Sequence, residues 1–86
     1  MTLAALIEDA RPRVIAALAG HCRDLDVAED GFADAVAALL ALPPEKQPAN
    51  VPGWLYVTAK RRIVDAMRGD ARRAALLARE ALTEDD

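Results

Sequence analysis

Apolar residues recur at intervals of three and four near the start of this chain, and that spacing restricts what the chain can fold into. Such residues share one face of an α-helix; here they are Leu3, Ile7, Ala10, Val14 and Leu18. Much of the apolar fraction elsewhere is Ala and Leu, which lose little side-chain entropy in a helix, while the alternating patterns of strands are absent. The sequence therefore predicts an all-α fold, a small bundle of three to four helices.

The length of 86 residues allows one small domain with one core. No internal repeat and no second domain is visible, so we expect a single domain over residues 1–86. Thr2 is expected to cap a first helix over about residues 2–23. Pro12 lies inside this helix, where its missing N–H kinks the helix or restarts it.

Capping residues and breakers delimit the remaining helices. Asp26 and Glu29 have the spacing of a capping box, which predicts a second helix over residues 27–42 that ends before Pro43. Asn50 is a candidate cap for a third helix over residues 51–68.

Gly69 is a favourable residue just after a helix C-terminus, so we expect the third helix to end there. Asp70 would then cap a fourth helix over residues 71–82.

Charge is distributed unevenly. Residues 1–59 carry a net charge of −4, residues 60–79 carry +5 and residues 80–86 carry −4, which together give the formal −3. A basic block inside an acidic chain indicates a local site for a polyanion, although a solvated helix face is the alternative.

The basic block overlaps the third predicted helix. A helical wheel at about 100° per residue gives that helix two faces. The expected buried face, with its margins, consists of Leu55, Tyr56, Val57, Ala59, Ile63, Val64, Ala66 and Met67. The opposite face consists of Trp54, Thr58, Arg61, Arg62, Asp65 and Arg68.

A tryptophan ring beside arginines suits nucleic acid, because arginines neutralise phosphates and the ring can stack on an unpaired base. The alternative for Trp54 is structural: the ring covers the preceding loop or folds back on the first helix.

No group of residues indicates catalysis. His21 and Cys22 are adjacent, cannot complete a four-ligand zinc site, and do not face each other on a helix as a nucleophilic pair must. The acidic stretch 24–34 lacks a twelve-residue calcium loop, and no Gly-rich phosphate loop is present. A capped, solvated helix start explains the stretch, and a protein-binding surface is the next interpretation. We expect no enzyme activity, no cofactor and no metal.

Cys22 is the sole cysteine, which excludes an internal disulfide and fits a reducing cytoplasm. No apolar run approaches the roughly 20 residues of a membrane span, and no signal peptide is visible. We therefore expect a cytoplasmic protein without a membrane partner.

The stretch from Asp24 to Arg68 resembles region 2 of extracytoplasmic-function (group IV) sigma factors of the sigma-70 family. That family typically shows a D-x-A-E-D start to one helix and, after a loop, a helix close to W-L-x-x-x-A-x-N-x-x-x-D-x-x-R. The matching residues are Asp26, Ala28, Glu29, Asp30, Trp54, Leu55, Ala59, Asp65 and Arg68. The resemblance covers roughly residues 5–75, and the order and spacing of the elements carry it.

The resemblance implies a transcription initiation domain that binds bacterial RNA polymerase core and recognises and melts the promoter −10 element. The acidic helix would bind the clamp helices of the largest polymerase subunit through Asp26, Glu29, Asp30 and Asp34. Loop residues between Pro43 and Gly53 would hold a flipped base. Together with the polar face of the third helix, the residues expected near promoter DNA are Asn50, Trp54, Thr58, Lys60, Arg61, Arg62 and Arg68. An anti-sigma factor is a further candidate partner.

The sequence also departs from the family pattern. Ala33 and Asp34 stand where a Gln-Glu pair is common, Arg61 replaces the usual Asn, and Gly31 replaces an aliphatic residue. We expect no helix-turn-helix domain of the kind that reads the −35 element (region 4) within residues 1–86. Two alternatives therefore remain: a helical protein–protein module, such as a sigma-like decoy or an anti-sigma-binding domain without a DNA role, or a bundle whose basic stripe is only solvated surface.

Overall fold

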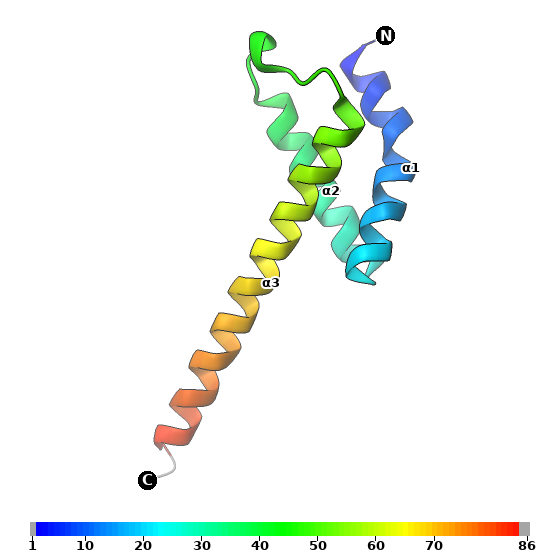
Figure 1. Ribbon diagram of the computed structural model, residues 1–86. Coiled ribbons are helices and arrows are strands. Elements are labelled where there is room, and N and C mark those ends of the chain that lie inside the picture. Colours follow the sequence, from blue (N-terminus) through cyan, green and yellow to red (C-terminus); the bar gives the residue numbers. More distant parts are fainter. Residues whose placement is uncertain (1, 85–86) are drawn as a thin grey trace.

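The computed structural model describes residues 2–84, which form three α-helices and one short 3-10 helix and contain no strand (Figure 1). The elements are α1 (Leu3–Cys22), α2 (Leu25–Leu40), η1 (Pro44–Lys46) and α3 (Val51–Glu84). α1, α2 and the first half of α3 pack against one another, while the second half of α3 projects away from them (Figure 1). The predicted all-α fold is confirmed.

α1 begins as predicted. The Thr2 hydroxyl oxygen accepts the Ala5 N–H at 3.1 Å, which satisfies one of the donors that a helix start leaves unpaired. The helix continues through Pro12 without restarting. Because Pro12 is exposed, water can reach the carbonyl group that the missing N–H leaves unpaired.

The turn between α1 and α2 is tighter than predicted. Arg23 adopts a left-handed conformation with φ 58°, and its N–H donates to the Ala19 carbonyl at 2.7 Å. Asp24 follows in extended conformation, and its carboxylate accepts the Val27 N–H at 3.2 Å. The prediction that Asp26 caps this helix is therefore wrong: the left-handed turn lets the helix begin two residues earlier. α2 also ends at Leu40 rather than at residue 42.

Asn50 caps α3 as predicted. Its side-chain oxygen accepts the Gly53 N–H at 3.1 Å, and its carbonyl accepts the Trp54 N–H at 3.0 Å. The helix then runs to Glu84 without a break.

The predicted stop at Gly69 and the separate helix 71–82 are wrong. No glycine of the described chain has a positive φ, so Gly69 stays helical. Glycine disfavours a helix by only about 1 kcal/mol, and the Ala, Leu and Arg residues around it favour one. Asp70 pairs with the Arg73 guanidinium in the next turn instead of capping a new helix.

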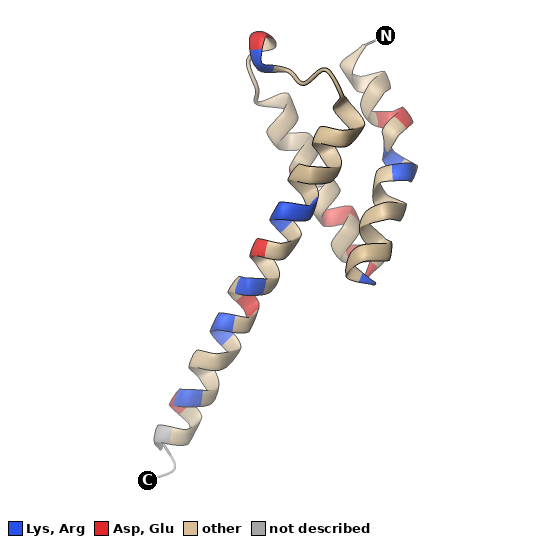
Figure 2. Cartoon of the chain, viewed as in Figure 1, with Lys and Arg blue, Asp and Glu red and all other residues tan. Residues whose placement is uncertain are grey.

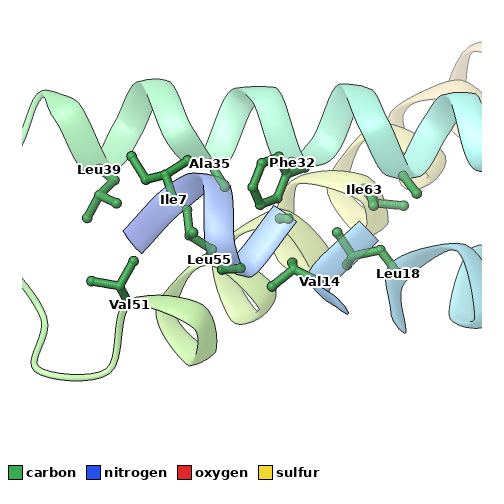
Figure 3. Packing of buried hydrophobic residues seen from close by; sticks show 12 residues of the cluster. Ile7, Val14, Leu18, Phe32, Ala35, Leu39, Val51, Leu55 and Ile63 are labelled. Atoms are coloured by element: carbon green, nitrogen blue, oxygen red, sulfur yellow. The ribbon is translucent and has the colours of Figure 1, made fainter. Parts of the chain in front are cut away.

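The core lies between the three α-helices (Figure 3). Its largest fully buried side chains are Phe32, Leu18, Leu39 and Leu55. α3 contributes a buried residue at every fourth position, namely Val51, Leu55, Ala59 and Ile63. Outside the core, the Arg11 guanidinium lies 5.1 Å from the centre of the Phe32 ring.

The predicted buried face of α3 is right only in part. Ala66 is exposed and the Met67 side chain is 57% exposed, because α3 passes the ends of α1 and α2 after Ile63. Val57 is also exposed, at 53%. Val51, which was not predicted, is 5% exposed and belongs to the core.

Candidate nucleic-acid and polymerase interface

The four acidic residues assigned to polymerase binding lie in the first ten residues of α2. Asp26, Glu29, Asp30 and Asp34 are all exposed. Within the described part of the chain, none of their carboxylates forms an ion pair. Acidic bands are visible on this part of α2, close to the end of α1 (Figure 2). Their charge is thus directed to solvent, where a cationic surface could meet it.

The segment that joins α2 to α3 covers residues 41–50, so the loop expected to hold a base lies only in part within it. Its residues between Pro43 and Asn50 include the short η1, whereas Val51 to Gly53 already belong to α3. The Asn50 side chain folds over Gly53: a Cβ added to this glycine would lie 2.8 Å from Asn50 Nδ2. One polar group of Asn50 is therefore used in capping, and its amide nitrogen is the part left for a ligand.

Trp54 lies in the first turn of α3 and is half-buried against the core cluster. One portion of the ring therefore packs on the bundle, as the structural interpretation expects, while another portion reaches solvent, where a base could stack on it. Thr58, one turn further along α3, is also half-buried.

Three of the predicted DNA-binding residues share one shallow depression on α3. Lys60, Arg61 and Arg68 line it, and so does one acidic residue, Asp65, which leaves an excess of positive charge. Tyr56, which the helical wheel placed on the buried face, is half-buried and lines the same depression, and the Lys60 ammonium lies 6.0 Å from the centre of its ring. The arrangement combines cations with an aromatic ring, the two features that bind phosphates and bases. The spacing Tyr56–Lys60 of one helical turn could have signalled this pair from the sequence.

Arg62 does not belong to this surface. It lines a groove of about 170 Å³ between α2 and α3, together with Asp30 and Asp34. The structure thus places a residue predicted to bind DNA beside two residues predicted to bind polymerase. The reason is geometric: α3 buries a stripe from Val51 to Ile63, and this stripe turns Arg62 toward α2 and away from Arg61.

Gly31 brings the two helices of this groove together. A Cβ at this position would lie 2.7 Å from side-chain atoms of Ile63 and 3.4 Å from the Ala59 carbonyl oxygen. A side chain here would require the Ile63 side chain to move or the two helices to separate. The departure of Gly31 from the family pattern therefore has a local structural reason, a close helix crossing.

Cys22 is half-buried, and its thiol donates a weak hydrogen bond to the Asp24 carbonyl at 3.3 Å. Across residues 2–82, no three His, Cys, Asp or Glu side chains come together as metal ligands. Within the same range no helix combines the length and apolar character that a membrane span needs.

Comparison with known proteins identifies the family to which the sequence belongs. The family model described as Sigma-70 region 2 matches residues 6–73. An uncharacterized protein of Rhizobium meliloti (strain 1021) is 33% identical over 78 residues, which are 90% of this chain but 18% of that protein. The chain thus spans less than a fifth of the length of this relative. No solved structure gives a significant match.

Region 2 of sigma-70 factors is a non-enzymatic transcription factor domain whose family-level role is RNA polymerase binding and promoter melting. The family match covers more than half of the sequence: it begins inside α1, includes α2 and ends at residue 73 within α3. This chain belongs to the Sigma-70 region 2 family.

Proposed function

We propose that this chain is the region 2 domain of an extracytoplasmic-function sigma factor, which docks on core RNA polymerase through α2 and holds the melted promoter −10 element with α3. The observation that carries the proposal is the depression on α3, where Lys60, Arg61 and Arg68 meet the Tyr56 ring. This depression lies within the segment that matches the family.

The polymerase contact rests on the acidic part of α2. Unpaired, exposed carboxylates are attracted to a cationic partner, and such complementarity mainly speeds association and selects the partner. Asp30 and Asp34 flank the groove that also contains Arg62. We assign Arg62 to this polymerase-facing groove rather than to DNA, because it can help to orient the two carboxylates.

The DNA contact rests on the first half of α3. Arginine and lysine side chains there neutralise phosphates, while the exposed portion of Trp54 and the Tyr56 ring can stack on unpaired bases. Stacking on one aromatic ring contributes about 1–3 kcal/mol per base. Melting then requires no chemistry, since the domain shifts the equilibrium by binding the open strand more tightly than the duplex.

The polymerase contact can be tested by co-elution of the chain with bacterial core RNA polymerase on a sizing column. The variant D30R/D34R should lose co-elution. The matched control is E8R/D9R, which has the same change in net charge but lies on α1. If both variants behave alike, or if the wild type fails to co-elute at micromolar concentration, the docking proposal is wrong.

The DNA contact can be tested by promoter opening, measured with a fluorescent base analogue in the −10 element. We expect W54A to reduce opening about tenfold, which corresponds to roughly 1.4 kcal/mol of lost stacking, while W54F keeps most of it. Trp54 also packs on the core, so thermal unfolding and polymerase binding are measured in parallel. Equal loss of opening and of polymerase binding in W54A would show that Trp54 acts through folding alone.

A further inference from the structure

A groove of about 390 Å³ lies between the end of α1 and the middle of α3. Val64, Met67 and Ala71 form its apolar wall on α3, while Cys22 and Arg23 belong to the wall on α1. The Met67 side chain is 57% exposed, so the described part of the chain leaves this apolar wall uncovered. The groove is therefore a candidate docking site for an occupant from outside the single chain.

The edge of this groove is basic. Arg23 and Arg68 both line it, and both are exposed. In the part of the chain that the structure describes, neither guanidinium forms an ion pair. Complementary charge across an interface selects the partner and speeds its association. An occupant that matches the groove thus combines an apolar side chain with negative charge.

The apolar wall continues along α3 beyond the groove. At about 100° per residue, Leu82 comes five full turns after Val64 and therefore lies on the same side of the helix. The Leu82 side chain is 75% exposed. We call this face the apolar strip, and its members fall within an arc of about 100°. They are Met67, Ala71, Ala74, Ala75, Ala78 and Leu82.

The spacing of the apolar strip is the same in both directions. Its successive members are four, three, one, three and four residues apart. A twofold contact between identical chains requires such self-complementarity, because residue i must meet residue j while j meets i. Two antiparallel copies of α3 would place Met67 of one against Leu82 of the other. The central alanines let the helix axes approach to about 8 Å.

The chain itself supplies an occupant of the required chemistry. Residues 80–86 carry a net charge of −4 and include Leu82. Within one chain this segment is far from the groove, because α3 runs to Glu84 without a break (Figure 1). An antiparallel second copy brings it to the groove and leaves the two bundles at opposite ends of the paired helices. The negative partial charge of a helix C-terminus adds to the attraction by Arg23 and Arg68.

From these observations we infer that the chain forms a twofold antiparallel dimer through the apolar strip, in which the acidic end of each copy occupies the basic groove of the other. The inference goes beyond the proposed function and does not depend on it. The paired segment 67–82 is about 23 Å long, a smaller contact than the roughly 1,600 Å² of a typical stable interface. We therefore expect a dissociation constant of roughly 100 μM. Well below that concentration the projecting half of α3 stays uncovered.

Sedimentation equilibrium of the isolated chain, from about ten times below to ten times above this concentration, measures the association. L82E should raise the dissociation constant at least about tenfold, because an apolar side chain leaves the groove. The matched control is L76E, since Leu76 is also more than half exposed but lies about 120° from Leu82 on the helix. A wild type that stays monomeric throughout would overturn the inference, and so would equal effects of L82E and L76E.

The contribution of charge is tested with R23E, which should weaken the dimer more than K46E does. Both substitutions change the net charge equally, but Lys46 lies in η1 and does not line the groove. Circular dichroism checks that each variant is folded. Equal dissociation constants for R23E and K46E would show that the groove does not receive the acidic segment.

The native thiol of Cys22 reports the orientation of the two copies. Under mild oxidation L82C should yield a covalent dimer, because position 82 enters the groove that Cys22 of the other copy lines. L76C should yield less, and C22A/L82C should lose the covalent dimer. If C22A/L82C still cross-links as well as L82C, position 82 meets itself as in a parallel pair, and the antiparallel dimer is wrong. Equal cross-linking of L82C and L76C would also contradict the assigned groove.

Discussion

The two halves of α3 are stabilised as helix in different ways. Its first half packs on α1 and α2 and buries Val51, Leu55, Ala59 and Ile63. In its second half every residue from Asp70 to Leu82 is exposed. The first half is thus held by tertiary contacts, whereas the second is held by the helix propensity of its own residues.

This difference bears on the task that we assign to the first half. A surface that orients unpaired bases needs side chains in fixed positions, which a packed helix provides. Four properties should differ between the two halves and can be measured: local stability, side-chain burial, the effect of glycine and helix capping.

Amide hydrogen exchange should show the largest difference. We expect amides of residues 55–63 to exchange only through global unfolding, at about 4 kcal/mol or more for a chain of this size. Amides of residues 72–82 should open at roughly 1 kcal/mol or less, because no packed side chain holds that half. Exchange measured by NMR residue by residue checks this. Equal protection in both halves would mean that the projecting half is covered, for example by a second copy of the chain.

Leucine truncation should give the next largest difference. Leu55 is fully buried, whereas Leu77 is 66% exposed on the same helix. L55A should lower the free energy of unfolding by about 3 kcal/mol through lost burial and a cavity, and L77A by less than about 0.5 kcal/mol. Urea denaturation measures both. A large loss in L77A would contradict the view that the second half is unpacked.

Alanine at two glycines should change stability in opposite directions. G31A places a methyl group against Ile63, and the overpacking outweighs the gain in helix propensity, for a net loss of about 1 kcal/mol. G69A has nothing within 4 Å of the new Cβ and should stabilise α3 by up to about 1 kcal/mol.

Thermal unfolding and helicity at 222 nm check the two glycine variants. The double variant G31A/I63V provides a control, because removing the Ile63 Cδ1 relieves one of the two short contacts. It should therefore lose less than the two single losses added together. A loss for G69A would indicate that Gly69 has a contact or a conformation that the helix does not show.

The sequence predicted correctly those features, such as helix caps, that depend on contacts between residues close together in the chain. Thr2 and Asn50 cap their helices as expected, because a capping oxygen needs only the next turn of backbone. The prediction of Asp26 as a cap was wrong because the helix start depends on Arg23, which adopts a left-handed conformation that glycine normally signals.

The directions of the remaining side chains of the candidate site depend on tertiary contacts, which the sequence alone did not predict. The helical wheel of α3 assumed that apolar residues as far as Met67 are buried, but the bundle ends at Ile63. This moved the centre of the buried face and with it the direction of Arg62, which meets α2 instead of the surface of Arg61. α3 does not end at Gly69 because no other element packs there to turn the chain.

The smallest expected effect concerns two residues that were predicted to cap helices, one at the start of each half of α3. Asn50 does cap α3, and N50A should lower the free energy of unfolding by about 1 kcal/mol. Asp70 instead makes an exposed pair with Arg73, with both side chains at least 70% exposed, so D70A should change stability by less than about 0.5 kcal/mol.

N50D then separates capping from DNA binding. Aspartate keeps the capping oxygen and should preserve stability. It replaces the amide donor that we propose to lie near the DNA by a negative charge, so it should weaken binding of a single-stranded −10 oligonucleotide (the probe) to the complex of chain and polymerase, as N50A should. Chemical denaturation and probe affinity are measured on the same preparations. Wild-type probe affinity in N50D would restrict Asn50 to capping and would move the DNA contact to the side chains beyond it on α3.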